Sequence, residues 1–230
     1  MNSEFSPSIT HPFYFIRNGL KSAIQANASA LNGKLLDFGC GSKPYRTLFN
    51  VEEYIGVDYH NEGHPHHNEQ IDVFYDGKSL PFPNASFDSV LCSEVFEHVF
   101  NLEEVLKELN RVTKTGGHML ITCPFVWNEH EVPYDFARYT VFALTDILQR
   151  NGYEIVSIQK AGNFVTTVTQ LRILYFKETF QKSLSASIPG RWLYKGLFVV
   201  LPNLIGKFMN RILPENKTMY LNNIVLVRKK

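Results

Sequence analysis

The sequence predicts a doubly wound α/β fold, in which a mostly parallel β-sheet lies between helices. Two observations lead to this class. Residues 35–42 (Leu-Leu-Asp-Phe-Gly-Cys-Gly-Ser) form a short apolar run followed by two glycines one residue apart. Residues 54–59 (Tyr-Ile-Gly-Val-Asp-Tyr) form a second apolar run that ends in an acid. Such runs are typical of buried parallel strands, so we expect two neighbouring strands, the first leading into a tight glycine turn.

The acids and glycines at the ends of these strands predict a nucleoside-containing cofactor. Gly39 and Gly41 let the backbone approach a ligand where a Cβ would clash or where φ must be positive. Asp58, at the carboxyl end of its strand, is placed to accept hydrogen bonds from a ribose diol. The dinucleotide fingerprint needs a third glycine, but this chain has Pro44 there. Asp37 would repel a pyrophosphate and accept from an ammonium group. S-adenosylmethionine, which has an ammonium group, a ribose diol and no phosphate, is therefore the predicted cofactor.

The remaining elements follow from apolar periodicity and from residues that end helices and strands. Thr140 is the expected N-cap of one helix, and Gly116-Gly117 is expected to end another in a left-handed cap. Helices are predicted over residues 12–31, 43–50, 102–116 and 140–151, and strands over 71–75, 89–92, 118–123, 153–160 and 221–228.

Five further segments strengthen the cofactor prediction because they occur together and in one order. They are Asp76-Gly77-Lys78-Ser79-Leu80-Pro81-Phe82, Ser86-Phe87-Asp88-Ser89-Val90, Glu97-His98-Val99, Arg111-Val112 and Gly116-Gly117. With the opening motif they make the chain resemble the class I S-adenosylmethionine-dependent methyltransferases, in their small-molecule, type 11-like branch. The resemblance covers about Leu31 to Ile158 and, weakly, the last strand.

This resemblance implies a Rossmann-like, seven-stranded sheet whose last strand is antiparallel, with an inserted helical segment before it. It also implies that Asp76 accepts from the adenine amino group and that the next backbone amide, of Gly77, donates to a ring nitrogen. The predicted cofactor-binding residues are Asp37, Gly39, Cys40, Gly41, Asp58, Tyr59, Asp76, Gly77, Ser93 and Glu94.

The acceptor of the methyl group is expected at the same edge of the sheet. Glu94 and His98 follow the strand over 89–92 and, one helical turn apart, are predicted to share a helical face. His98 is a candidate for acid–base chemistry or for shaping the transfer site, with a purely structural histidine as the alternative.

The loop over residues 127–140 is the predicted acceptor-binding segment, since it is aromatic, mixed in charge and just past the end of a strand. Part of it resembles a pattern of the same methyltransferase branch. His130, with His98, is a candidate catalytic base, needed only if the acceptor must lose a proton. An ion pair between Arg138 and Asp135 that simply fixes the loop is the alternative. The predicted substrate-binding residues are Trp127, Glu129, Asp135, Arg138 and Tyr139.

Composition is that of an ordinary globular protein, but charge is unevenly distributed. The net charge is +1, yet the segment from Lys160 to Lys230 holds 12 Lys or Arg and two acids, and the remainder carries −9. This asymmetry indicates an anionic surface or substrate near the C-terminal part, or merely a solvated basic face. No nucleic-acid partner is expected.

Cysteine and histidine usage bears on the compartment and on metals. The three cysteines show no metal-ligand spacing, so we expect free thiols in a reducing compartment. His60, His64, His66 and His67 cluster without cysteines or patterned carboxylates, so no metal site is predicted. The N-terminus lacks the form of a signal peptide, and no apolar run reaches membrane-spanning length. A cytoplasmic location is expected, with peripheral contact to a membrane left open.

The chain is expected to be one methyltransferase domain over residues 1–230 with a helical insertion over 162–219. The insertion should contain a helix from Phe164 and a basic, apolar helix or pair over 191–213, broken at Pro202. Its role is left open between a lid, a membrane contact and a homodimer interface.

The predicted function is methyl transfer from S-adenosylmethionine to a small-molecule, lipid or glycan acceptor. The alternatives are a non-enzymatic module that binds a membrane or partner, and a nucleotide-dependent oxidoreductase, which Pro44 and Asp37 disfavour.

Overall fold

The computed structural model describes residues 5–59 and 69–230. Its contacts divide the chain into two compact units. We call Ala23–Gln159 with Asn223–Lys230 the sheet unit, and Met1–Ser22 with Lys160–Asn222 the helical unit. The two units are described separately.

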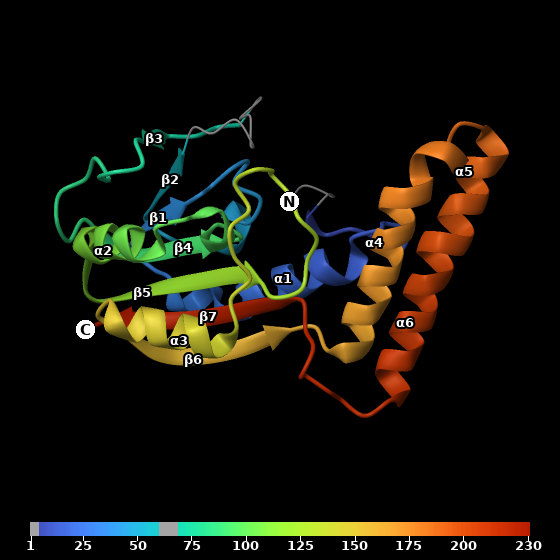
Figure 1. Ribbon diagram of the computed structural model, residues 1–230. Coiled ribbons are helices and arrows are strands. Elements are labelled where there is room, and N and C mark those ends of the chain that lie inside the picture. The colour runs from blue at the N-terminus through green and yellow to red at the C-terminus, as the bar shows by residue number, and fades with distance from the viewer. Residues whose placement is uncertain (1–4, 60–68) are drawn as a thin grey trace. The chain divides into compact units, whose positions relative to one another are not determined.

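A seven-stranded sheet with the order β3-β2-β1-β4-β5-β7-β6 forms the core of the fold (Figure 1). β4 is the central strand, and β1 beside it pairs in parallel with β2 and β4, from which β3 and β5 continue outward, also in parallel. β7 lies between β5 and the edge strand β6. This is the predicted Rossmann-like sheet with antiparallel last strands. The strands are β1 (Lys34–Phe38), β2 (Glu53–Tyr59), β3 (Val73–Tyr75), β4 (Phe87–Ser93), β5 (Thr113–Pro124), β6 (Tyr153–Ala161) and β7 (Asn222–Lys229).

The helices α2 and α3 lie alongside this sheet (Figure 1), and each buries apolar side chains. α2 (Leu102–Val112) buries Leu102, Val105, Leu106, Leu109 and Val112, which follow helical spacing. α3 (Val141–Arg150) begins at Thr140, whose hydroxyl accepts from the Ala143 amide as predicted. α1 (Tyr14–Asn27), followed by the 3-10 turn Ala28–Ala30, lies within the helix predicted over 12–31, and its last turns belong to the sheet unit.

Two predicted helices are shorter than expected, for local reasons. The helix expected over 43–50 is a single 3-10 turn, Arg46–Leu48, because Lys43 has a positive φ of 51° and Pro44 follows it. The predicted end of α2 at Gly116-Gly117 is wrong, since the chain enters β5 directly at Thr113. Gly116 keeps its positive φ, 79°, within the strand rather than in a helix cap.

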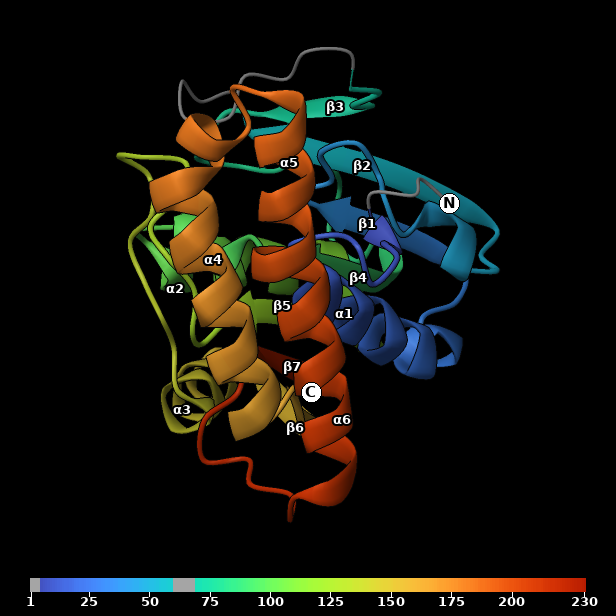
Figure 2. The ribbon, with the colours of Figure 1, turned by 90° about the vertical axis from the view of Figure 1, so that its right-hand side faces the viewer.

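The helical unit contains the expected insertion. α4 (Phe164–Leu184) starts at a capping box formed by Asn163 and Thr166. It lies beside α6 (Leu201–Ile212), and Figure 2 shows the two helices running next to each other. Buried amides fix the N-terminal segment to them. The Gln170 amide donates to the Pro12 carbonyl at 2.8 Å, and the Asn203 amide donates to the Ile9 carbonyl at 2.8 Å.

The predicted break at Pro202 is wrong. The chain is helical from α5 (Ile188–Tyr194) through a π-helical turn (Lys195–Val200) into α6. Proline removes an N–H donor and its ring crowds the carbonyl four residues earlier. The wider π turn contains the carbonyl four residues before Pro202, so it accommodates both the missing N–H donor and the proline ring, and the helix continues. Among the described residues, no helix is long and apolar enough to cross a bilayer.

Candidate functional site

The glycine turn after β1 meets Asp58 at the end of β2. The amides of Gly39 and Cys40 donate to the Val57 carbonyl at 2.8 and 3.1 Å. The Gly41 amide donates to Asp58 Oδ2 at 2.7 Å, and the Tyr59 amide donates to Oδ1 at 2.7 Å. The structure therefore brings together the glycine turn and the acid that the sequence assigned to one nucleoside.

Gly39 occupies a place that no other residue fits. Its φ is 72°, and a Cβ built there would lie 2.3 Å from Cγ2 of Val95. Both the conformation and the space require glycine. Val95 belongs to the segment after β4, so the turn packs closely against the carboxyl end of the next strand.

Asp37 is buried beneath this turn and accepts a 2.5 Å hydrogen bond from the Tyr54 hydroxyl. Burial, with a smaller effect from the nearby charge of Asp58, raises the pKa of Asp37 to about 7. A cation placed next to Asp37 would favour its charged form. Tyr54 was not among the predicted site residues, although it is the first residue of the apolar run that forms β2.

Asp76 and Gly77 form a tight turn after β3. Asp76 Oδ1 accepts from the amides of Lys78 and Ser79 at 2.8 and 3.0 Å, and these bonds lower the pKa of its carboxyl. A Cβ on Gly77 would lie 3.1 Å from the Tyr59 ring. Tyr59, a predicted cofactor-binding residue, thus lies next to Gly77, which with Asp76 was predicted to meet the adenine. The histidines at positions 60, 64, 66 and 67 fall outside the described residues.

Ser93 and Glu94 are held by β5. The Glu94 amide donates to the Thr122 carbonyl at 2.9 Å, and the Thr122 hydroxyl donates to Glu94 Oε1 at 2.8 Å. Glu94 has a positive φ of 56°. The prediction that Glu94 and His98 share a helical face is therefore wrong, because only Phe96–His98 form a single 3-10 turn.

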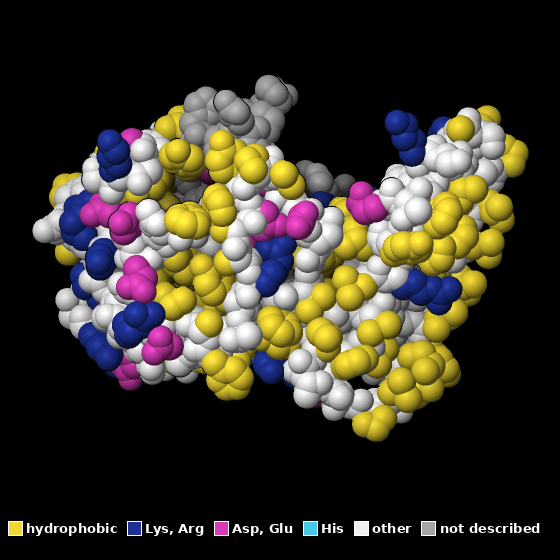
Figure 3. Space-filling model, in the orientation of Figure 1, with side chains coloured by type: hydrophobic (Ala, Val, Ile, Leu, Met, Phe, Trp, Pro, Cys, Tyr) yellow, Lys and Arg dark blue, Asp and Glu magenta, His cyan; other side chains and the backbone are white. Residues whose placement is uncertain are grey.

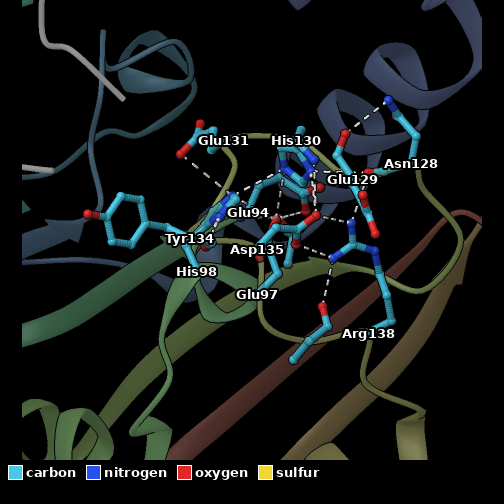
Figure 4. A network of polar contacts seen from close by, with 12 residues as sticks. Glu94, Glu97, His98, Asn128, Glu129, His130, Glu131, Tyr134, Asp135 and Arg138 are labelled. Carbon is cyan, nitrogen blue, oxygen red and sulfur yellow. Dashed lines mark hydrogen bonds and ion pairs between the residues drawn. The ribbon is translucent and has the colours of Figure 1, made fainter. Parts of the chain in front are cut away.

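His98 and His130, both candidate catalytic residues, meet directly (Figure 4). Their Nε2 atoms are 3.1 Å apart. His98 Nδ1 lies 2.8 Å from the Tyr134 carbonyl oxygen. His130 Nδ1 lies 3.3 Å from the Asn128 carbonyl oxygen and 3.3 Å from Asp135 Oδ2. Burial and the neighbouring His98 lower the pKa of His130.

Glu97 completes this cluster, and the sequence analysis did not assign it a role. It is fully buried, and among the described residues neither carboxylate oxygen has a hydrogen-bond partner. Its Oε1 lies 3.9 Å from His98 Nε2 and 4.0 Å from His130 Nε2. Burial, followed by the charge of Glu94, raises the pKa of Glu97 well above its usual value. The sequence signal that could have pointed to a role for Glu97 is the position of an acid within the apolar stretch 95–100.

Arg138 and Asp135 fix the loop over 127–140. Arg138 donates to both oxygens of Asp135, at 2.5 and 2.7 Å, and to the Asn128 carbonyl at 2.9 Å. Burial acts to raise the pKa of Asp135, but these bonds lower it to about 2. Asp135 Oδ2 also accepts from the His130 amide at 3.1 Å. These contacts are those of an ion pair that fixes the loop, which was the alternative left open for Arg138 and Asp135 in the sequence analysis.

The other predicted acceptor residues differ in their surroundings. Glu129 is exposed, Trp127 is half-buried, and Tyr139 packs against the core of the sheet unit. All three cysteines are buried and free, as predicted. Burial raises the pKa of the Cys40, Cys92 and Cys123 thiols, so none carries the charge of a reactive thiolate.

Comparison with known proteins agrees with this geometry. Residues 36–121 match the model of the methyltransferase domain family Methyltransf_11. The malonyl-[acyl-carrier protein] O-methyltransferase of Erwinia pyrifoliae is 30% identical over 95 residues, which are 39% of this chain and 36% of that protein. The chain spans about half or less of the length of such curated relatives.

Solved structures show the same fold at low identity. The S-adenosylmethionine-dependent methyltransferase of Archaeoglobus fulgidus superposes with a TM-score of 0.55 at 19% identity, covering 99% of this chain and 97% of that one. The [4+2]-cyclase SpnF gives a TM-score of 0.59 at 16% identity, covering 97% of this chain and 85% of that one. Residues 36–121 therefore identify a methyltransferase domain of the class I S-adenosylmethionine-dependent type, and the fold of the chain is the fold of this class.

Proposed function

We propose that this protein transfers a methyl group from S-adenosylmethionine to a small-molecule, lipid or glycan acceptor. The observation that supports this most is the contact between the Gly41 amide and Asp58, which joins the carboxylate at the end of β2 to the glycine turn after β1, beside the switch point between β1 and β4. Crevices at such a point, outside the carboxyl ends of the strands, are where α/β folds bind nucleosides.

Each residue of this edge has a role in the proposal. Asp58 accepts from the ribose hydroxyls, Asp76 and Gly77 meet the adenine, and Asp37 faces the ammonium group of the methionine part. Gly39 lets the backbone approach the cofactor. The sulfonium supplies the driving force, so the protein mainly aligns donor and acceptor in line.

The acceptor is assigned to the loop over 127–140. His130 and His98 come from segments that follow the carboxyl ends of β5 and β4, the edge to which the cofactor is assigned. Arg138 and Asp135 support this proposal because they fix the backbone around His130, through the Asn128 carbonyl and the His130 amide. Because these contacts fix the backbone around His130, we favour a loop that positions the acceptor rather than one that is only a solvated surface segment.

A methyl-transfer screen tests this function. The protein is incubated with tritiated S-adenosylmethionine and with lipid, glycan and small-molecule extracts, beside Asp58→Ala. Label that enters one fraction with the wild type and not with the variant is the expected result. Because the cyclase SpnF has this fold, the fold alone does not fix the reaction. Binding of S-adenosylhomocysteine without label transfer to any fraction would favour a non-enzymatic module.

We further propose that the helical unit contacts an anionic membrane or an amphiphilic acceptor. α6 turns an apolar stripe outward, at helical spacing, while its buried side carries Asn203 and Gly206. The stripe residues Leu201, Leu204, Ile205, Phe208 and Ile212 are 46–62% exposed. Figure 3 shows hydrophobic side chains gathered over the helices of this unit. An apolar stripe of this kind in a soluble protein calls for a covering surface.

Basic side chains accompany this stripe and favour an anionic bilayer as that surface. Lys182, Arg191, Lys195, Lys207 and Arg211 are all exposed. Each contributes on the order of 1 kcal/mol near an anionic surface, and salt screens the attraction. Their stems can lie along apolar surface while the charges reach the headgroups.

Liposome co-sedimentation decides between this contact and a lid or dimer interface. Phosphatidylserine-containing vesicles are compared with phosphatidylcholine vesicles at low and high salt. Phe208→Glu is expected to abolish sedimentation, whereas Phe142→Glu, an equal change at a residue of α3 that is 82% exposed, should not. If the wild type fails to sediment even at low salt, the membrane contact is rejected, and sedimentation velocity then tests for a dimer.

A further inference from the structure

We propose that Glu97, His98 and His130 form a binding site for one divalent transition-metal ion, such as Zn²⁺. The sequence predicted no metal site, and this one is assembled from segments 32 residues apart. The inference rests on the proposed function in one respect, since it places the ion in the region assigned to the acceptor. The site itself follows from the geometry of three side chains.

The distances between the ligand atoms suit a single ion. Glu97 Oε1, His98 Nε2 and His130 Nε2 form a triangle with sides of 3.1, 3.9 and 4.0 Å. The point equidistant from its corners lies inside it, about 2.2 Å from each atom. Zn–N bonds are about 2.0–2.1 Å and Zn–carboxylate bonds about 2.0–2.2 Å. An ion therefore fits with almost no movement of the ligands.

The hydrogen bonds of both imidazoles leave the right atoms free to coordinate. A carbonyl oxygen can only accept, so His98 Nδ1, 2.8 Å from the Tyr134 carbonyl, carries a proton. The same holds for His130 Nδ1, which faces the Asn128 carbonyl and Asp135. In neutral imidazoles both Nε2 atoms then present lone pairs to each other at 3.1 Å. A cation between them turns this repulsion into coordination.

The buried carboxylate is an independent indication of a ligand. Buried polar groups are normally paired, because an unpaired one costs the desolvation of that group. Among the described residues Glu97 has no hydrogen-bond partner, while its Oε1 is directed at the two histidines. A metal ion would satisfy it. Two histidines and one carboxylate are a frequent donor set for Zn²⁺ and for Fe²⁺.

The surroundings hold the ligands in place as outer partners of metal sites do. Metal-binding histidines usually donate their other N–H to a carbonyl or carboxylate, which fixes the ring. Asp135 receives the His130 amide and is itself held by Arg138. The backbone of Phe136 donates to the Glu97 carbonyl at 2.8 Å, tying the loop to the segment after β4.

Zinc held by three protein ligands would keep a fourth coordination position for another ligand. An oxygen of the acceptor, from a hydroxyl, carboxylate or phosphate group, is the chemistry suited to such a position. Glu131 Oε2 lies 3.8 Å from His98 Nε2 and is a further carboxylate near the cluster. With the ion bound, both Nε2 lone pairs are used, so the histidines position the acceptor instead of acting as bases.

Zinc titration of the full chain tests the site. Protein stripped with a chelator is titrated with Zn²⁺ by calorimetry, and Co²⁺ is added separately to follow visible ligand-field bands. The variants are Glu97→Gln, His98→Ala and His130→Ala, with His118→Ala as the matched control, since His118 lies in β5 outside the cluster. Each is also prepared with His60, His64, His66 and His67 replaced by Ala, because those histidines are outside the described residues.

One Zn²⁺ per chain is expected, with affinity at least tenfold lower in each of the three ligand variants and unchanged in His118→Ala. Zn²⁺ should also raise the melting temperature of the wild type but not that of Glu97→Gln. Wild-type zinc affinity in folded Glu97→Gln, or no zinc binding by the wild type, would overturn the site.

Calorimetry with S-adenosylhomocysteine on the same preparations separates this inference from the proposed function. Cofactor binding without zinc binding overturns the metal site alone. Zinc binding that follows the expected variant pattern, without cofactor binding, supports the metal site and contradicts the proposed function.

Discussion

Replacing Asp58 by Ala should weaken binding of S-adenosylhomocysteine by about 10- to 150-fold. In the structure both oxygens of Asp58 already accept one backbone amide each, from Gly41 and Tyr59, at 2.7 Å. These bonds orient the carboxylate, and a carboxylate oxygen can accept more than one hydrogen bond, so the ribose hydroxyls can donate to the same two oxygens. Hydrogen bonds to a charged group contribute about 1.5–3 kcal/mol, and about 1.4 kcal/mol corresponds to a tenfold change in affinity.

Isothermal titration calorimetry at about pH 8, where Asp37 is charged, measures the effect. Asp146→Ala is the matched control, because Asp146 is an exposed acid of the sheet unit that only pairs with Arg150. Circular dichroism verifies that both variants are folded. If Asp58→Ala binds within threefold of the wild type, the assignment of Asp58 to the ribose is wrong.

Four further predictions concern the cofactor edge of the sheet and the loop over 127–140. Because burial gives Asp37 a pKa of about 7, affinity for S-adenosylhomocysteine should rise between about pH 6 and 8 as the carboxylate forms, and Asp37→Asn should remove that dependence. The same shift makes the uncharged acid the favoured form in the folded state. The contribution of Asp37 to the free energy of unfolding is therefore complete below about pH 4 and should decline as the pH rises toward 7. Urea titrations at several pH values measure this decline. Gly39→Ala should lower that free energy by about 1–3 kcal/mol through strain at positive φ and contact with Val95, whereas Gly196→Ala, with open space around it, should not. Arg138→Ala should cost about 1–3 kcal/mol by leaving Asp135 unpaired and lower turnover, yet keep the affinity for S-adenosylhomocysteine. Loss of cofactor binding in the folded variant would contradict the division between cofactor edge and acceptor loop.

The fold was largely predictable because its signals are local. The apolar runs that became β1 and β2 end in Asp37-Phe38 and Asp58-Tyr59, so strand and ligand edge could be inferred together. The predicted ends of helices were wrong where the backbone conformation of a neighbouring residue or turn overrode the apolar pattern or the proline signal. The left-handed Lys43 shortened one helix, and the π turn before Pro202 preserved another.

The candidate site was less predictable because it depends on long-range packing. Gly41 and Asp58 could be paired from motifs, but nothing in the sequence places the side chain of Glu97 beside the contact between His98 and His130. That arrangement arises because the loop after β5 folds back onto the turn after β4, tied by the Phe136 and Ala137 amides to the Glu97 carbonyl. Contacts between two loops leave no periodic pattern in the sequence, unlike the buried faces of helices and strands.

A crystal structure with S-adenosylhomocysteine bound tests the central claim most directly. The ribose hydroxyls should donate to Asp58, the ammonium group should lie within hydrogen-bonding distance of Asp37, and the sulfur should face the loop that carries His130. Well-defined cofactor density elsewhere, or a ribose that does not contact Asp58, would contradict the account.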